Sequence, residues 1–213
     1  MLHKNRLNCL WRCLMNKLVK QGLVWLGAAM IAVSLIACDS LFPPQGDLVE
    51  RVSDGDTLIL KSADGKKFTV RFACIDAPEI AHSQTEKKSK ITQDVNQFVW
   101  GMKAKTRIEE LIKQTDNRVK LNMTDSDRYG RKVAEVRSKD GTFLQEVLLK
   151  EGLAKVYRPY LSKCPSRDII QQAEAQAQKQ RIGIWSDRKF IDPWDYRKAN
   201  NSHRMKRTTD LKY

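Results

Sequence analysis

The chain has 213 residues, of which 39 are Lys or Arg and 25 are Asp or Glu, and its formal net charge is +14. With 41% apolar residues, few glycines and prolines and no repeat of fixed period, the composition excludes long disorder, collagen and coiled coil. Only one long apolar run occurs, which excludes a multi-pass membrane protein, and the length predicts one domain with extensions. The excess of positive charge favours polyanionic partners, either nucleic acid or an anionic lipid surface.

Residues 1–38 are typical of an export signal. Residues 22–37 carry no charge, follow two lysines and end at Cys38. This run is shorter than the roughly 20 residues that cross a bilayer comfortably as a helix, which favours a cleaved signal. Its end, Leu35-Ile36-Ala37-Cys38, resembles the lipobox of bacterial lipoproteins, and the resemblance implies that Cys38 becomes the lipid-bearing first residue of the mature protein.

Two other interpretations of this segment stay open: an uncleaved signal anchor, and a secretory signal in which Cys38 is coincidental. Met15 is an alternative start of the chain. The lipobox interpretation predicts an exported protein tethered to a cell-envelope membrane, on its periplasmic or extracellular face. The same resemblance implies that Asp39, directly after the lipidated cysteine, retains the protein on the inner membrane, as in some Gram-negative bacteria. Removal of residues 1–38 takes away five basic and no acidic residues, so the net charge falls from +14 to +9 and the mature chain stays basic.

Two further cysteines, Cys74 and Cys164, remain in the mature chain. In an oxidising compartment, two such thiols favour a disulfide. The alternative is that both are small, buried apolar side chains, which is ordinary for a cysteine such as Cys74 in an apolar strand. The sequence leaves both interpretations open.

The regular elements begin after a short linker at residues 39–45. Apolar residues on either side of the turn Asp64-Gly65 predict a β-hairpin between residues 58–60 and 68–72. Residues 80–94 are polar and lack periodicity, which predicts a mobile loop.

The second half of the chain predicts helices and further strands. Apolar residues spaced by three and four predict an amphipathic helix at residues 95–112, with Val95, Val99 and Met102 among the side chains that pack on the core. The remaining elements are a strand, a second hairpin and two more helices, expected at 119–121, at 133–143, at 144–151 and at 169–179. Gly152 suits a left-handed residue at the end of the 144–151 helix.

Strands first, with helices interspersed, indicate an α+β domain, which we place at residues 46–191. A five-stranded barrel of the OB type with about three helices fits this order of elements, although composition alone does not select it. Residues 192–213 are rich in basic side chains and predict a mostly disordered tail suited to phosphates or anionic lipid.

Four carboxylates cluster at predicted strand ends: Asp54, Asp56, Asp76 and Glu79. Carboxylates that arrive from separate loops are hard oxygen ligands, which suit Ca²⁺ or Mg²⁺ better than Zn²⁺. The chain has three histidines, which argues against a zinc site or a general base built on histidine.

Two arginines, Arg71 and Arg131, accompany these carboxylates. A guanidinium presents a planar fork of donors that matches phosphate oxygens and stays charged at any working pH. Hydrolysis of a phosphodiester gathers negative charge on the phosphoryl oxygens in the transition state, so fixed positive charge there lowers the barrier. A carboxylate opposite the arginines can serve the attacking water. This set of residues therefore indicates phosphodiester hydrolysis.

Over residues 46–186 the chain resembles the staphylococcal nuclease, or thermonuclease, family. The resemblance rests on four ordered stretches: VSDGDT at 52–57, RFACIDAPE at 71–79, DRYGR at 127–131, and EGLA at 151–154 followed by AEAQA at 173–177 and GIW at 183–185. Each stretch alone is weak, whereas four in the right order are specific.

The resemblance implies a Ca²⁺-dependent nuclease that cleaves DNA and RNA, with single-stranded or frayed substrates preferred, and leaves 3′-phosphates. It implies that Asp56 and Asp76 bind Ca²⁺ through their side chains and that Ala77 binds it through its carbonyl. The family often has Thr at the position of Ala77, but a backbone ligand tolerates Ala.

The same resemblance assigns the catalytic roles. Glu79 would position or deprotonate the attacking water, and Arg71 and Arg131 would hold the scissile phosphate, with Arg131 also near the leaving 5′ oxygen. Asp127 is expected to cap the loop that holds Arg131. Taken singly, the segment 54–56 could be only a turn stabilised by Asp54, and Arg71 could be a surface residue.

Three tyrosines are candidates for stacking on bases: Tyr129, Tyr157 and Tyr160. Tyr129 is alternatively a core residue. The spacing in Tyr157-Arg158-Pro159-Tyr160 departs from the usual pattern of the family.

Two functions compete with the nuclease. The first is a non-catalytic nucleic-acid-binding lipoprotein on the same barrel, since such barrels commonly bind without cutting. The second is a lipoprotein whose basic surface binds anionic polymers of the envelope. The presence of Arg71, Glu79 and Arg131 together favours the enzyme, which we expect to be a monomer.

Overall fold

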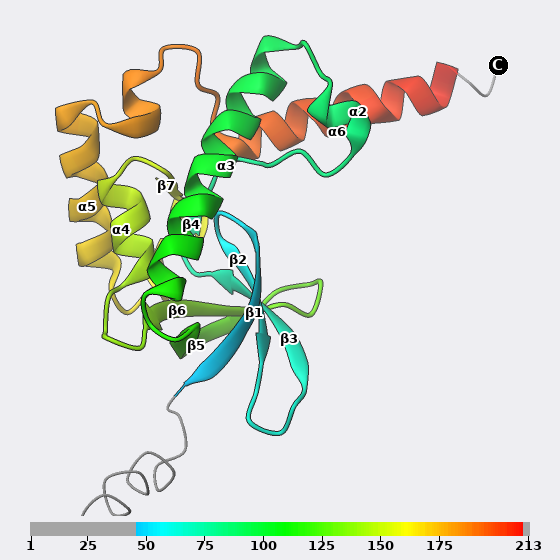
Figure 1. Ribbon diagram of the computed structural model, residues 1–213. Helices are drawn as coiled ribbons and strands as arrows, with labels where there is room; N and C mark the ends of the chain where they lie inside the picture. Colours follow the sequence, from blue (N-terminus) through cyan, green and yellow to red (C-terminus); the bar gives the residue numbers. More distant parts are fainter. Residues whose placement is uncertain (1–45, 211–213) are drawn as a thin grey trace, which may run out of the picture. The chain divides into compact units, whose positions relative to one another are not determined.

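The structure is a computed structural model that describes residues 46–210, with the side chains described as far as residue 202 (Figure 1). The predicted export signal, the lipidation site Cys38 and the linker at 39–45 lie outside the described residues. Within the described part of the chain, no helix combines the length and the apolar character needed to cross a membrane.

Five strands close into a barrel in the order β1-β2-β3-β6-β5. They are β1 (Asp47–Asp54), β2 (Thr57–Lys61), β3 (Lys67–Phe72), β5 (Arg118–Ser126) and β6 (Lys132–Ser138). Neighbouring strands are antiparallel except β3 and β6, which are parallel. Closure pairs the strand edges that an open sheet would leave exposed. The predicted α+β fold with a five-stranded OB-type barrel is confirmed.

Alternation along the strands builds the core of the barrel. Leu58 and Leu60 in β2, and Val70 and Phe72 in β3, are buried almost completely. Side chains two residues apart point to the same face of a strand, so each strand contributes one apolar row to the interior. The hairpin predicted between β2 and β3 is present, and Gly65 in its turn has a φ of 83°.

The second predicted hairpin was wrong in its pairing. We expected the strand at 133–136 to pair with the region of Phe143, but β6 pairs along its length with β5, across the loop at 127–131. Phe143 makes a single bridge to Arg137 and then leads directly into α4 (Leu144–Lys150). Leu144, Leu148 and Leu149 follow helical spacing and are fully buried, which draws the chain into a helix rather than a strand.

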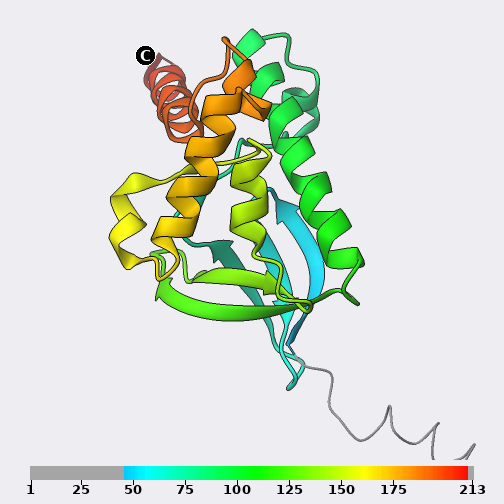
Figure 2. The ribbon, with the colours of Figure 1, turned by 90° about the vertical axis from the view of Figure 1, so that its left-hand side faces the viewer.

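Three helices stand side by side against the barrel: α3 (Thr92–Lys113), α4 and α5 (Arg167–Gln180) (Figure 2). The helix predicted at 144–151 ends as expected, because Gly152 has a φ of 61°. Gly152 also lies so close to Gly183 that a Cβ on either residue would meet backbone of the other segment. Short elements complete the fold: β4 (Ile75–Asp76), β7 (Lys155–Val156), and the 3-10 helices η2 (Arg158–Lys163) and η3 (Gly183–Ser186).

The loop predicted at 80–94 contains regular structure. A short helix, α2 (Gln84–Lys87), begins after Ser83, whose side chain accepts a hydrogen bond from the Glu86 N–H while the Glu86 carboxylate accepts from the Ser83 N–H. This reciprocal capping box was present in the sequence as Ser-x-x-Glu. No apolar periodicity follows it, so the pattern alone did not predict a helix.

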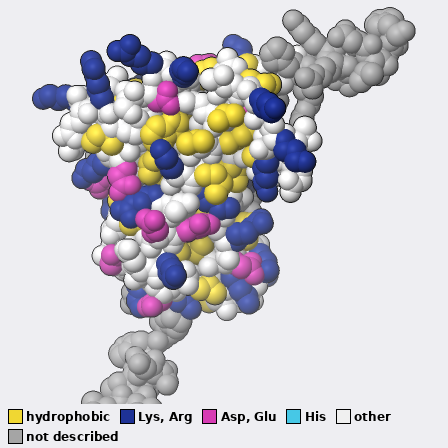
Figure 3. All heavy atoms as spheres, turned by 45° about the horizontal axis from the view of Figure 1, so that its top comes forward, with side chains coloured by type: hydrophobic (Ala, Val, Ile, Leu, Met, Phe, Trp, Pro, Cys, Tyr) yellow, Lys and Arg dark blue, Asp and Glu magenta, His cyan; other side chains and the backbone are white. Residues whose placement is uncertain are grey.

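Helix α3 exists where predicted but turns a different face to the core. Val95, Val99 and Met102 are 45%, 48% and 48% exposed. The buried positions of α3 are Gln97, Gly101, Ala104, Ile108 and Ile112. Its first half therefore packs through small or polar residues, and apolar side chains reach the surface among lysines and arginines on the face that Figure 3 presents.

Gly101 explains this choice of face. A Cβ at Gly101 would lie 2.2 Å from the carbonyl oxygen of Glu79 and 2.7 Å from that of Pro78. The helix therefore touches the backbone of the 78–79 segment directly, which no larger side chain at this position would allow.

The C-terminal segment was also predicted incorrectly. We expected residues 192–213 to be mostly disordered, but α6 (Pro193–Asp210) is a helix. The ring of Tyr196 is buried and lies edge-on to Phe98 at 6.3 Å, and its hydroxyl donates to Asp94 at 2.8 Å. These contacts dock the first turns of α6 on α3.

The two cysteines left open by the sequence form a disulfide in the structure. It joins Cys74, in the turn between β3 and β4, to Cys164, just after η2, with 6.4 Å between the Cα atoms. Cys74 has a φ of 62°, which a non-glycine residue adopts at a cost, and the bond fixes this turn two residues before Asp76.

We predict that Gly101→Ala destabilises the protein by about 1–3 kcal/mol, because the added methyl overpacks against backbone that cannot rotate away. Helix propensity alone predicts the opposite, a gain of about 1 kcal/mol. Urea unfolding of both proteins measures the difference. Met102→Ala, at the exposed neighbouring position, is the control and should change stability by less than about 0.5 kcal/mol. A stabilised Gly101→Ala protein would refute the close helix contact.

Candidate active site

One guanidinium holds two of the predicted acidic residues together. Arg71, on β3, donates to Asp56 Oδ1 at 2.9 Å through Nη1 and to Asp76 Oδ1 at 2.6 Å through Nη2. The side chains of Asp56 and Asp76 are 4% and 1% exposed, whereas that of Arg71 is 23% exposed. The predicted ligands Asp56 and Asp76 therefore lie together beneath the arginine that was predicted to hold phosphate.

The turn between β1 and β2 shapes the position of Asp56. Asp54 Oδ1 accepts from the Asp56 N–H at 3.0 Å, so Asp54 stabilises the turn as expected. Asp56 Oδ2 accepts from the Ala77 N–H at 2.9 Å, which connects this turn to the segment after β4. Gly55 permits the approach, since a Cβ there would lie within 2.8 Å of the side chains of Ala77 and Ala104.

Asp76 is placed by the small sheet of β4 and β7. It pairs with Lys155 in the antiparallel register of these two strands. The buried carboxylate of Glu174, on α5, accepts from the Val156 N–H at 2.7 Å and so fixes β7. Residues far along the chain therefore determine where Asp76 lies.

Glu79 lies at the edge of the same site, with 26% of its side chain exposed. Buried Gln97, on α3, accepts from the Glu79 N–H at 3.3 Å through its side-chain oxygen. The side-chain nitrogen of Gln97 donates to the carbonyl of Ile191, just before α6. One amide thus positions both Glu79 and the start of α6.

The structure adds a residue that the sequence analysis missed. Arg197, on α6, donates to Asp76 Oδ1 at 3.1 Å and Oδ2 at 2.5 Å, and to Glu79 Oε1 at 2.5 Å. The signal that could have found this helix is Pro193 followed by Trp194 and Tyr196. Proline is frequent at the first position of a helix, and aromatic residues are rare in disordered tails.

Arg131 comes from the loop between β5 and β6. Its Nε donates to Asp127 Oδ2 at 2.6 Å, and Asp127 Oδ1 accepts from the N–H groups of Tyr129 and Arg131 at 2.9 and 3.0 Å. Asp127 therefore caps this loop, as predicted. Burial alone would raise the pKa of Asp127, but these hydrogen bonds lower it, so the carboxylate stays charged beside Arg131.

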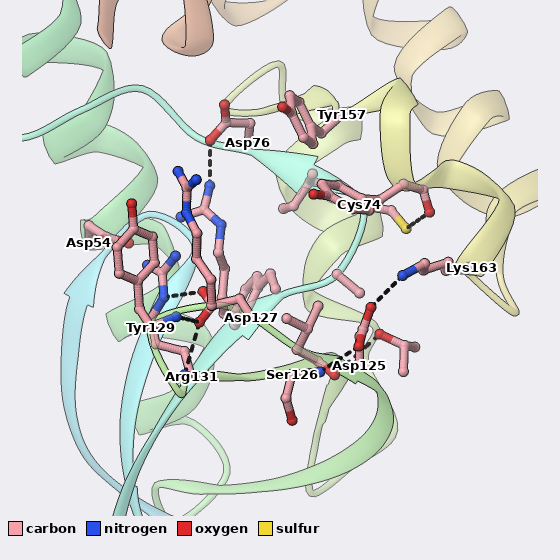
Figure 4. A pocket seen from close by; sticks show the side chains of 18 of the residues that line it. Asp54, Cys74, Asp76, Asp125, Ser126, Asp127, Tyr129, Arg131, Tyr157 and Lys163 are labelled. Carbon is pink, nitrogen blue, oxygen red and sulfur yellow. Dashed lines mark hydrogen bonds and ion pairs between the residues drawn. The ribbon is translucent and has the colours of Figure 1, made fainter. Parts of the chain in front are cut away.

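These segments surround one cleft of about 780 Å³. Its walls include Arg71, Asp76, Glu79, Arg131, Arg197 and all three predicted tyrosines. Figure 4 shows Asp54, Asp76, Tyr129 and Arg131 around the same opening, with the Lys163–Asp125 ion pair at 2.6 Å on another side. The predicted ligands Asp56 and Ala77 lie in the buried layer behind this wall.

The predicted tyrosines differ in their surroundings. The side chain of Tyr129 is 70% exposed, so it is not a core residue, and its ring lies 5.6 Å from the Arg131 guanidinium. Tyr157 lies between Tyr160 and Trp194, with ring centroids 5.6 Å away in both pairs. The cleft therefore has one exposed aromatic ring at the loop, Tyr129, and a separate cluster of aromatic rings around Tyr157.

The acidic groups of the site carry more negative charge than the structure neutralises. Burial, followed by the neighbouring charge of Asp56, raises the pKa of Asp54 to about 7. Burial raises the pKa of Asp76 despite its arginine partners, and the Asp56 charge adds to this effect. The charge of Asp56 in turn raises the pKa of Arg71. An additional cation would stabilise this cluster.

The donor chemistry of the cluster fits Ca²⁺. Asp56 and Asp76 provide hard carboxylate oxygens, and their surplus charge favours a dication. Among the residues that the structure describes, no group of three His, Cys, Asp or Glu side chains is arranged to hold a metal ion. The oxygens of Asp76 are instead engaged by Arg71 and Arg197.

Comparison with known proteins agrees with this arrangement. Residues 69–187 match the model of the family described as "Staphylococcal nuclease homologue". The chain belongs to the staphylococcal nuclease family. The sequence resemblance placed side-chain roles in catalysis and metal binding at five residues. All five lie in or directly behind the cleft of this structure: Arg71, Glu79, Arg131, Asp56 and Asp76.

Individual relatives within this family bear nuclease names. A micrococcal nuclease of Shigella flexneri is 29% identical over 86% of this chain and 98% of its own length. An uncharacterized endonuclease of Haemophilus influenzae is 32% identical over 70% of this chain and 71% of its own length. The endonuclease YhcR of Bacillus subtilis is 33% identical over 66% of this chain. The matched region covers only 11% of the length of YhcR.

The raised pKa of Asp54 predicts a pH-dependent effect of Asp54→Asn on stability. The folded protein binds this proton more tightly than the unfolded chain does, so wild-type stability falls as the pH rises from about 4 through 7. Asn keeps the oxygen that accepts from the Asp56 N–H but cannot ionise. Without divalent cations, the variant should gain stability over wild type between pH 5 and pH 8, by about 1.4 kcal/mol per pKa unit at most.

Denaturant unfolding at both pH values, with chelator present, measures this gain. Asp64→Asn is the control, because Asp64 is exposed in the β2–β3 turn and hydrogen bonds, first from Ser62, lower its pKa. The difference in stability between Asp64→Asn and wild type should not change between pH 5 and pH 8. An Asp54→Asn effect that is equally flat would contradict the raised pKa of Asp54.

Proposed function

We propose that this protein is a Ca²⁺-dependent nuclease that hydrolyses DNA and RNA and leaves 3′-phosphate ends. Family membership and the nuclease names of the relatives establish the coarser statement, a nuclease that hydrolyses phosphodiester bonds. The observation that carries the finer proposal is the convergence of Arg71, Glu79 and Arg131 on one cleft whose acidic wall has surplus charge. A module that only binds nucleic acid would not need Glu79 opposite two guanidinium groups.

Asp56 and Asp76, with the backbone of Ala77, would hold Ca²⁺ in this proposal. When bound, the ion supplies positive charge next to the phosphoryl oxygens of the substrate. The remaining steps belong to the side chains of the chain itself.

Arg71 and Arg131 would bind the scissile phosphate. Arg71 is fixed from below by Asp56 and Asp76, and Arg131 is fixed from the side by Asp127. Donors that are already oriented need no reorganisation as negative charge grows on the phosphate, so they stabilise the transition state more than the ground state. Arg131 would also face the leaving 5′ oxygen.

Glu79 would accept a proton from the attacking water. Its carboxylate is partly exposed at the cleft, while its backbone is held by Gln97 and by contact with Gly101. A general base needs this combination of access and fixed position. Tyr129, with its exposed ring, would stack on a base of a single-stranded or frayed substrate.

Glu79→Gln tests the general base. The amide keeps the shape of Glu79 but cannot take a proton at neutral pH, so turnover of single-stranded DNA should fall by about 10²–10⁴ while Ca²⁺ binding persists. The assay compares digestion by the full chain in Ca²⁺ and in chelator. Glu109→Gln, on the exposed face of α3, is the control and should cut normally. Turnover by Glu79→Gln at the wild-type rate would remove Glu79 from the mechanism.

Arg131→Lys tests whether the paired guanidinium donors of Arg131 bind the scissile phosphate. Lys keeps the charge but loses the planar pair of donors, so kcat should fall by about 10². Single-turnover cleavage of a defined oligonucleotide measures it. Arg137→Lys, elsewhere on the β5–β6 pair, is the control and should have little effect. Near-normal cleavage by Arg131→Lys would argue against bidentate contact. Wild-type protein that binds single-stranded DNA but leaves it intact in Ca²⁺ would instead favour the binding module.

A further inference from the structure

Arg197 brings a positive charge from α6 to the carboxylates that the proposed function uses for metal and water. Its Nη2 donates to Asp76 Oδ2 at 2.5 Å, and its Nη1 is shared between Asp76 Oδ1 at 3.1 Å and Glu79 Oε1 at 2.5 Å. It therefore joins a predicted metal ligand to the predicted base. Neither the match to the family, which ends at residue 187, nor the sequence resemblance includes this residue.

The hydrogen bonds to Asp76 occupy most of the acceptor positions with which its carboxylate could bind a metal ion. A carboxylate has about four acceptor positions on its two oxygens. Oδ1 accepts from both Arg71 and Arg197, and Oδ2 accepts from Arg197. About one acceptor position, on Oδ2, is left beside the Arg197 guanidinium, and a dication at that position would repel the guanidinium.

The contacts that anchor α6 are separate from this guanidinium. Asp192 pairs with Lys155 at 2.5 Å, Tyr196 is buried against α3, and Trp194 lies beside Tyr157. The Arg197 side chain, by contrast, is 38% exposed and lies at the wall of the cleft together with Asn201. The side chain of Arg197 can therefore leave the carboxylates while the first turn of α6 stays docked.

We propose that Arg197 is an internal cation that competes with Ca²⁺ for Asp76 and Glu79. Without metal, the Arg197 guanidinium binds the carboxylates of Asp76 and Glu79 and closes this side of the cleft. We call this contact of Arg197 with Asp76 and Glu79 the clasp. Binding of Ca²⁺ displaces it, which frees Asp76 as a ligand and Glu79 as a base at the same time. The inference rests on the proposed Ca²⁺ dependence, and it makes metal affinity depend on a helix outside the barrel.

Calorimetric titration of Ca²⁺ into the metal-free full chain in detergent tests the competition. A clasp that must open before metal binds weakens the apparent affinity, so Arg197→Gln should bind Ca²⁺ at least about tenfold more tightly than wild type. Lys198→Gln is the matched control, because it removes one positive charge from the exposed neighbouring position of α6. Its affinity should stay within about twofold of wild type.

A second measurement needs only the folded wild-type protein. The side-chain Nε–H signal of Arg197 in ¹⁵N NMR, assigned by its absence from Arg197→Lys, should shift when Ca²⁺ is added, as the guanidinium leaves two carboxylates. A signal that does not move, or an Arg197→Gln affinity equal to or weaker than wild type, would overturn the clasp and make Arg197 a fixed positioning residue.

These failures can be told apart from failure of the proposed function. If wild-type protein cleaves DNA only with Ca²⁺ while the Arg197 results are negative, the nuclease proposal stands and the clasp is wrong. If neither wild type nor Arg197→Gln binds Ca²⁺ and chelator leaves cleavage unchanged, both the Ca²⁺ dependence and the clasp are wrong.

Discussion

The site depends on one buried electrostatic contact, in which the Arg71 guanidinium faces Asp56 and Asp76. Without the arginine, two carboxylates that are almost fully buried would repel each other in a medium of low dielectric constant. Breaking such a contact from one side leaves uncompensated charge, which costs about 3–5 kcal/mol in buried pairs. The same contact orients Arg71 toward the cleft. Stability and chemistry therefore rest on the same atoms.

Local signals predicted several of the strands, and a five-stranded barrel fitted the order of the elements and the resemblance to the family. Alternating apolar residues around Asp64-Gly65 define the β2–β3 hairpin, and short ordered motifs mark the end of β3 with Arg71 and the loop with Arg131. The spacing of apolar residues also located α3. The spacing did not predict which face of α3 is buried. That face depends on how closely Gly101 approaches the backbone near Glu79, and the distance between two segments leaves no periodic pattern in the sequence.

The missed parts of the site are those created by tertiary contacts. Basic composition made the C-terminal segment resemble a disordered tail, yet burial of Tyr196 against α3 gives it a reason to fold. Once α6 is docked there, Arg197 reaches Asp76 and Glu79 without any motif of its own. In the same way, Gln97 has no sequence signal that sets it apart from the other polar residues of α3, yet it supports the backbone of Glu79 from within the core.

The tie between Cys74 and Cys164 spans 90 residues of sequence. A ribosome that has released only the first hundred residues has already made Asp56, Arg71, Asp76 and Glu79, but it has made neither Arg131, nor the β7 strand that pairs with Asp76, nor the second cysteine. Such truncated chains therefore possess only part of the site, without the framework that aligns it. The disulfide and the β4–β7 pairing that place Asp76 form only after synthesis has passed Cys164.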